Sequence, residues 1–75
     1  MSPAPALREP QVRIFRAPSR PGYILLDDRS GGEHFALTLR GARRLAARVL
    51  ADEVADPGYS PWRFTRGDLV EEVRV

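Results

Sequence analysis

The chain has 75 residues, of which 43% are hydrophobic, and carries a formal net charge of +2 at pH 7 with no cysteine. A chain this short buries only about 60% of the surface that its unfolded form exposes, and without cysteine neither disulfides nor zinc thiolates stabilise it. These properties indicate a single domain with a small apolar core. The core either stabilises the chain alone or is completed by a partner subunit.

We expect neither a membrane-spanning helix nor a secretory signal in this chain. No segment approaches the ~20 consecutive apolar residues of a membrane-spanning helix. The start, MSPAPALREPQ, lacks the basic residues and apolar stretch of a secretory signal. We therefore expect a soluble, cytoplasmic protein with no membrane partner, and the lack of cysteine fits a reducing compartment.

All twelve basic residues are arginine. Codon usage in a GC-rich bacterial or phage genome explains this composition without any function. Selection for bidentate contacts to phosphate or carboxylate groups is the functional alternative. The net charge of +2 is too small to indicate nucleic-acid binding by itself.

The first ten residues contain three prolines among small residues, and we interpret segment 1–10 as a flexible arm before a single domain over residues 11–75. Three segments of that domain have the β-branched, aromatic and apolar composition of strands. They are QVRIFR at 11–16, YILLD at 23–27 and HFAL at 34–37. The second is apolar on both faces, which predicts a central strand, and DDRSGGE before the third predicts a hairpin turn.

Apolar residues recur at helical spacing over residues 39–52, which predicts an amphipathic helix that ends at about residue 53. Thr38 is placed to cap its first turn. The apolar stripe that we expect to pack on the sheet consists of Leu39, Ala42, Leu45, Ala46, Val49 and Leu50. Arginines occupy the opposite face.

The C-terminal segment allows two predictions. Thr65 and Phe64 have the positions of a helix cap and a hydrophobic staple, so the preferred prediction is a short helix over 66–73. The alternative is a turn at Gly67 and Asp68 followed by a strand, LVEEVRV. The predicted fold is therefore α+β: a small three- to four-stranded antiparallel sheet packed on one amphipathic helix (about 39–53), with a short C-terminal helix or strand.

The single histidine, His34, lies near several acidic and hydroxyl residues in the sequence. They are Asp27, Asp28, Ser30 and Glu33. A Ser–His–Asp relay needs three of these groups to converge, whereas turns collect Asp, Ser and Gly for backbone reasons and alternate strand residues point apart. The segment also lacks the alternating oxygen ligands of a calcium loop. We expect no catalytic residue, no cofactor and no metal site, and therefore no enzymatic activity.

The arginine face of the predicted helix is the first candidate binding surface. Arg40, Arg43, Arg44 and Arg48 span about two turns and are suited to a phosphate backbone or an acidic partner. The alternative is an ordinary solvated helix face. Gln11 is the only Asn or Gln side chain in the protein, which argues against reading of adenine bases.

The second candidate is a protein interface formed by residue types that dominate interface hot spots. Its members are Tyr23, Tyr59, Trp62 and Arg63. The alternative is that the aromatic residues belong to the core, with Tyr59 and Trp62 folded over it as a lid. Strand 11–16 is a candidate edge strand that pairs across a two-fold axis, so a homodimer is a further alternative.

From these features we expect a small non-catalytic protein that docks on a protein or a nucleoprotein complex. Inhibitors and adaptors encoded by phages or mobile elements are proteins of this kind. The alternative is a nucleic-acid-binding regulator that uses the arginine face of helix 39–52.

Overall fold

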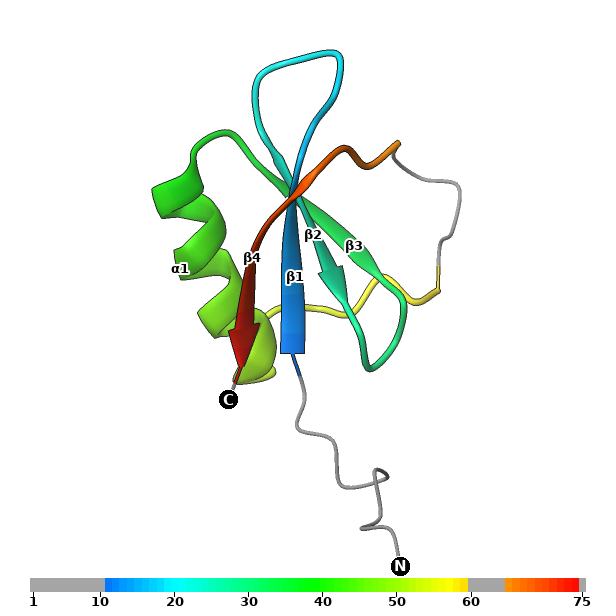
Figure 1. The fold of residues 1–75 in the computed structure, drawn as a ribbon. Helices are drawn as coiled ribbons and strands as arrows, with labels where there is room; N and C mark the ends of the chain where they lie inside the picture. Colours follow the sequence, from blue (N-terminus) through cyan, green and yellow to red (C-terminus); the bar gives the residue numbers. More distant parts are fainter. Residues whose placement is uncertain (1–10, 60–64, 75) are drawn as a thin grey trace, which may run out of the picture.

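The computed structural model describes residues 11–59 and 65–74. In this part of the chain the elements follow in the order β1 (Gln11–Arg16), β2 (Tyr23–Asp27), β3 (Glu33–Ala36), α1 (Leu39–Leu50) and β4 (Leu69–Arg74). The strands form one antiparallel sheet in the order β3-β2-β1-β4, and α1 lies across one face of it (Figure 1). The predicted α+β fold, an antiparallel sheet packed on one helix, is confirmed.

Strand β1 lies inside the sheet. Its Phe15 is opposite Ile24 of β2, and its Val12 is opposite Val73 of β4. The prediction that segment 11–16 forms a sheet edge is therefore wrong. The strand that pairs with this edge of β1 is β4, from the far end of the chain, so the sequence near β1 does not indicate it. Among the described strands the sheet edges are β3 and β4.

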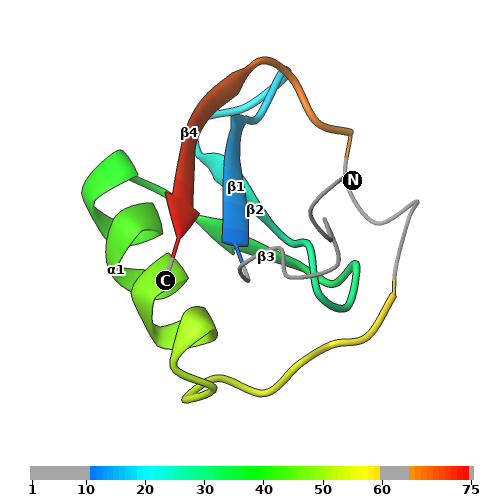
Figure 2. The same cartoon turned by 60° about the horizontal axis from the view of Figure 1, so that its bottom comes forward.

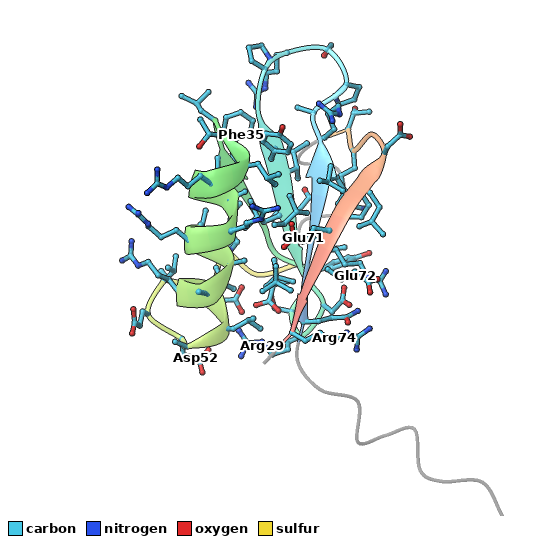
Figure 3. All side chains as sticks on the ribbon, turned by 60° about the vertical axis from the view of Figure 1, so that its left-hand side comes forward. Arg29, Phe35, Asp52, Glu71, Glu72 and Arg74 are labelled. Carbon is cyan, nitrogen blue, oxygen red and sulfur yellow. The ribbon has the colours of Figure 1, made fainter. Side chains whose placement is uncertain are left out.

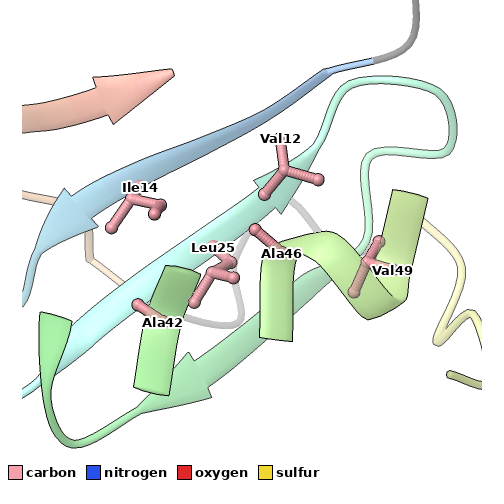
Figure 4. Close-up of a cluster of buried hydrophobic side chains, with 6 residues drawn as sticks. All are labelled: Val12, Ile14, Leu25, Ala42, Ala46 and Val49. Carbon is pink, nitrogen blue, oxygen red and sulfur yellow. The ribbon is translucent and has the colours of Figure 1, made fainter. Parts of the chain in front are cut away.

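The core lies between α1 and the face of the sheet that α1 covers. The sheet contributes Val12, Ile14 and Leu25, all fully buried, and α1 contributes small side chains that let it approach closely (Figure 4). On the opposite face Ile24 is also buried, with 2% exposure. The prediction that YILLD forms a central strand is therefore confirmed.

Helix α1 begins as the sequence predicts. The Thr38 hydroxyl oxygen accepts a hydrogen bond of 3.0 Å from the Gly41 N–H, which satisfies one of the unpaired donors of the first turn. The helix ends at Leu50, two to three residues earlier than predicted, and Asp52 adopts a left-handed backbone conformation with φ 59°. No helix among residues 11–59 and 65–74 is long and apolar enough to cross a membrane.

The preferred prediction of a helix over 66–73 is wrong, and the alternative strand is confirmed. The Gly67 N–H donates to the Arg16 carbonyl, and the Arg16 N–H donates to the Asp68 carbonyl, both at 2.9 Å. These two bonds align the following residues against β1. Because β1 offers unpaired backbone groups on this side, strand pairing outweighs the local helix signals of the segment.

The β2–β3 hairpin differs slightly from its prediction. Strand β3 runs from Glu33 to Ala36, one residue earlier than predicted, and Leu37 lies outside it with 70% exposure. The predicted turn contains Gly31 with φ 79°, a conformation that favours glycine.

Candidate functional site

The arginine face of α1 is exposed along its length. Arg40, Arg43, Arg44 and Arg48 are all exposed, while Ala42, Ala46 and Val49 on the opposite side are buried. Figure 3 shows nitrogen-tipped side chains that project from α1 away from the sheet. The structure therefore brings the four predicted arginines onto one side of the helix.

Two of these arginines have acidic partners. Arg43 Nε lies 2.9 Å from Glu71 Oε1 of β4, and Arg48 Nε lies 4.0 Å from Glu53 Oε1. Arg40 and Arg44 form no ion pair within the described residues. The positive charge that remains available for a ligand is therefore concentrated in the first two turns of α1.

Two residues of the predicted protein interface, Tyr23 and Tyr59, lie at opposite ends of β2. Tyr23, at the start of β2, packs against the core, and the Arg16 guanidinium lies 5.8 Å from the centre of its ring. Tyr59 lies at the other end of β2, against Gly31, with 76% exposure, so it is not a lid over the core. Trp62 and Arg63 lie outside the described residues.

A polar pocket of about 270 Å³ lies beside the β2–β3 turn and the end of α1. Its lining includes three residues of the predicted histidine cluster, Asp27, Ser30 and His34. The other two lie elsewhere: Asp28 accepts a hydrogen bond from the side chain of Gln11, and Glu33 pairs with Arg66. More of the cluster converges than we expected, because His34 is opposite Leu25 and therefore shares a sheet face with Asp27.

Arg29 links the pocket to α1. Its guanidinium donates to both carboxylate oxygens of Asp27, at 3.2 and 3.1 Å, and to the Val49 carbonyl at 2.8 Å. The hydrogen bonds with Asp27 raise the pKa of Arg29 above its ordinary value. Arg29 therefore keeps its charge and holds the turn against the end of the helix.

The Ser30 hydroxyl has a different partner from the one that a catalytic relay needs. It donates a hydrogen bond of 3.0 Å to the Asp56 carboxylate, which also accepts 2.9 Å from the Gly58 N–H. These two donors, the Gly58 amide first, lower the pKa of Asp56 below its ordinary value of 3.8. These hydrogen bonds join the segments that line the pocket. Residues 11–59 and 65–74 contain no group of three or more His, Asp or Glu side chains arranged to hold a metal ion.

Two features escaped the sequence analysis. Arg66 reaches across the sheet face that α1 leaves open, 2.6 Å from the buried Glu33 and over the ring of Phe15. In addition, an apolar groove of about 300 Å³ separates the end of α1 from β4, lined by Ala47, Leu50, Ala51, Val73 and Arg74. Both join segments that are distant in the sequence, so no local pattern indicates them.

No known protein family, curated protein or solved structure matches this chain.

Proposed function

We propose that this protein is a non-catalytic binding protein that docks on an anionic surface of another protein or of a nucleoprotein complex. The observation that carries the proposal is the outer face of α1, where Arg40 and Arg44 are exposed and form no ion pair within the described residues. Guanidinium groups bind carboxylate and phosphate groups through two parallel hydrogen bonds.

The spacing of the arginines suits an extended anionic partner. Arg40, Arg44 and Arg48 recur every four residues, so they form one row along α1 of about 12 Å, at about 1.5 Å per residue. The helix is held by the Thr38 cap at one end and by Arg29 at the other. A row on a fixed helix loses little backbone freedom on binding.

We further propose that the protein acts by occupying its partner's surface, as an inhibitor or an adaptor of phage or mobile-element origin. Its small size supports this role. The pocket beside the β2–β3 turn also supports this role, because its Arg29 and Ser30 side chains form hydrogen bonds that stabilise the fold.

A nucleic-acid-binding regulator is the second candidate, and the same row of arginines favours it. Helix α1 carries neither Asn nor Gln, so it would contact phosphates in preference to adenine edges. Such binding weakens steeply between about 50 and 200 mM salt, because each phosphate contact releases counterions.

Affinity purification with charge-reversed variants tests the docking proposal. We expect the wild type to recover a stoichiometric protein partner from nuclease-treated extract of the source organism. The variant R40E/R44E should lose it. The matched control R16E/R20E, which reverses two exposed arginines at the β1–β2 hairpin, should retain it.

Retention of the partner by R40E/R44E, or recovery of no partner at all, would overturn docking through α1. Salt-sensitive binding to a short DNA duplex that R40E/R44E abolishes, without a protein partner, would establish the second candidate instead.

A further inference from the structure

The outer edge of β4 offers free backbone hydrogen-bonding groups. Between β1 and β2, the Asp28 N–H donates to the Gln11 carbonyl and the Ala17 N–H to the Gly22 carbonyl, each at 3.1 Å. The odd-numbered residues of β1 therefore bond β2, and the even-numbered ones bond β4. Val12 is opposite Val73, so Val73 directs its backbone groups to β1.

By the same alternation, Glu72 and Arg74 direct their backbone N–H and C=O groups away from β1. No strand of the described residues covers this edge. Figures 1 and 2 both show β4 at the margin of the sheet beside α1. An open edge of this kind is a template for a further strand.

The apolar groove runs beside this edge. Ala47 of α1 and the C-cap residue Ala51 are exposed, and Leu50 and Val73 are half-buried. The edge and the groove together present backbone donors and acceptors next to an apolar surface. This combination fits a partner that contributes both a strand and an apolar helix end.

We propose that the partner is a second copy of this chain, paired through β4 across a two-fold axis that passes beside Val73. In an antiparallel pair of identical strands, the residue on the axis lies opposite itself, and its neighbours lie opposite each other. An axis at Val73 places Glu72 of each copy opposite Arg74 of the other. Opposite charges at facing positions favour a pair of strands, and like charges disfavour it.

The alternative registers are less favourable. An axis at Glu72 places two glutamates opposite each other, and an axis at Arg74 does the same with two arginines. An axis at Glu71 brings its two copies face to face. Among the axes at residues 71–74, the one at Val73 is the one that places opposite charges at facing positions of β4.

The two charged residues also have partners within one copy, and Glu72 Oε2 lies 3.6 Å from Arg13 Nε of β1. Within one copy, Glu72 Oε1 already lies 3.2 Å from Arg74 Nη2. Figure 3 shows both side chains on the side of β4 away from α1, and Glu71 on the side toward it. When Glu72 of one copy pairs with Arg74 of the other, the Arg43–Glu71 ion pair within each copy therefore stays in place.

On the other face of the sheet, the same axis closes the groove. Val73 packs on the core beside Leu50, so the two copies bring their grooves together across the axis. The alanines allow the two helix ends to approach. The resulting dimer has one continuous sheet, and the grooves between α1 and β4 of the two copies form a shared apolar interface.

Light scattering on the full chain over a wide range of concentrations tests the proposal. We expect the wild type to reach twice the monomer mass and no higher. E72R and R74E, which place like charges opposite each other, should each weaken the dimer at least tenfold, and the exchanged double variant E72R/R74E should restore it. A47E should weaken it through the groove, whereas S19E, the same charge in the exposed β1–β2 loop, should not.

Amide hydrogen exchange gives a second readout that does not depend on the variants. The Glu72 and Arg74 amides should gain protection as the protein concentration rises, while the Val73 amide is protected throughout. A wild type that stays monomeric, forms open-ended polymers, or dimerises equally well in E72R and A47E contradicts the proposal. Because R40E/R44E leaves the β4 edge intact, failure of the dimer and failure of the docking proposal are distinguishable.

Discussion

The guanidinium of Arg29 donates a hydrogen bond of 2.8 Å to the carbonyl of Val49, and so joins the β2–β3 turn to the last turn of α1. The same side chain pairs with Asp27, which is only 3% exposed. One residue thus satisfies a carbonyl at the helix end and a shielded carboxylate. Cations are favoured at this end of a helix because its carbonyls carry partial negative charge.

We expect R29M to lower the free energy of unfolding by about 2–3 kcal/mol, because Asp27 loses its cationic partner while remaining buried. The matched control is D52N, which removes the other acidic partner of Arg29. Asp52 is 80% exposed, so this change should cost no more than about 0.5 kcal/mol. Urea unfolding at one protein concentration measures both, and equal losses would contradict the role of the buried pair.

The ion pair between Arg66 and Glu33 predicts a strong asymmetry between single and double variants. The Glu33 side chain is fully buried, and its Oε1 has no hydrogen-bond partner within the described residues. R66M should therefore cost about 3 kcal/mol, since it leaves a buried carboxylate without its cation. R66M/E33Q should recover part of that loss. If the double variant is less stable than R66M, the cost arises from lost packing of Arg66 over Phe15 and the charge is not its source.

Gly22 should resist replacement more than another glycine with positive φ. Its φ is 128°, and an added Cβ would come within 2.3 Å of the Phe35 ring. Gly58 has φ 80° and open space around it, so G58A should cost only the backbone term, about 1 kcal/mol. We expect G22A to cost at least about 1 kcal/mol more than G58A, as overpacking adds to backbone strain. Thermal unfolding followed by circular dichroism compares the two, and equal losses would exclude the steric contribution.

We expect the free energy of unfolding to decrease in acid because of Asp56. Its pKa is lowered in the folded protein, chiefly by the Gly58 N–H and then by the Ser30 hydroxyl. A group with a lowered pKa stabilises the fold above its unfolded pKa, and this contribution disappears as the pH falls through the folded value. The free energy of unfolding should therefore decrease below about pH 4, near the ordinary pKa of aspartate.

The variant D56N should show a shallower decrease in this pH range, because its amide oxygen still accepts hydrogen bonds but does not titrate. S30A should lie between D56N and the wild type, since the Gly58 donor remains. Urea unfolding at several pH values checks the order, and identical slopes in D56N and the wild type would rule Asp56 out as a source of the acid sensitivity.

Much of the fold follows from short-range patterns. The apolar stripe of 39–50, the Thr38 cap and the glycine of the β2–β3 turn each depend on residues within one or two turns of each other, so the sequence indicates them directly. The arginine row belongs to the same class, because helical spacing alone places Arg40, Arg44 and Arg48 on one side. What each arginine pairs with does not follow from spacing: the partner of Arg43 is Glu71, on a strand distant in the chain.

The tertiary structure decided the state of the C-terminal segment, and with it the position of β1. FTRGDLVEEVR carries helix signals and strand signals of similar local strength. The open backbone groups of β1 select the strand, because hydrogen bonds and burial of Val73 against the core are available only there. The same long-range pairing moved the sheet edge from β1 to β4, brought Arg66 to Glu33 and created the groove beside Leu50. The sequence alone determined the first three strands, α1 and their apolar faces, whereas contacts between distant segments determined the state of the C-terminal segment, which strand is exposed, which charges are buried and which surface is left for a partner.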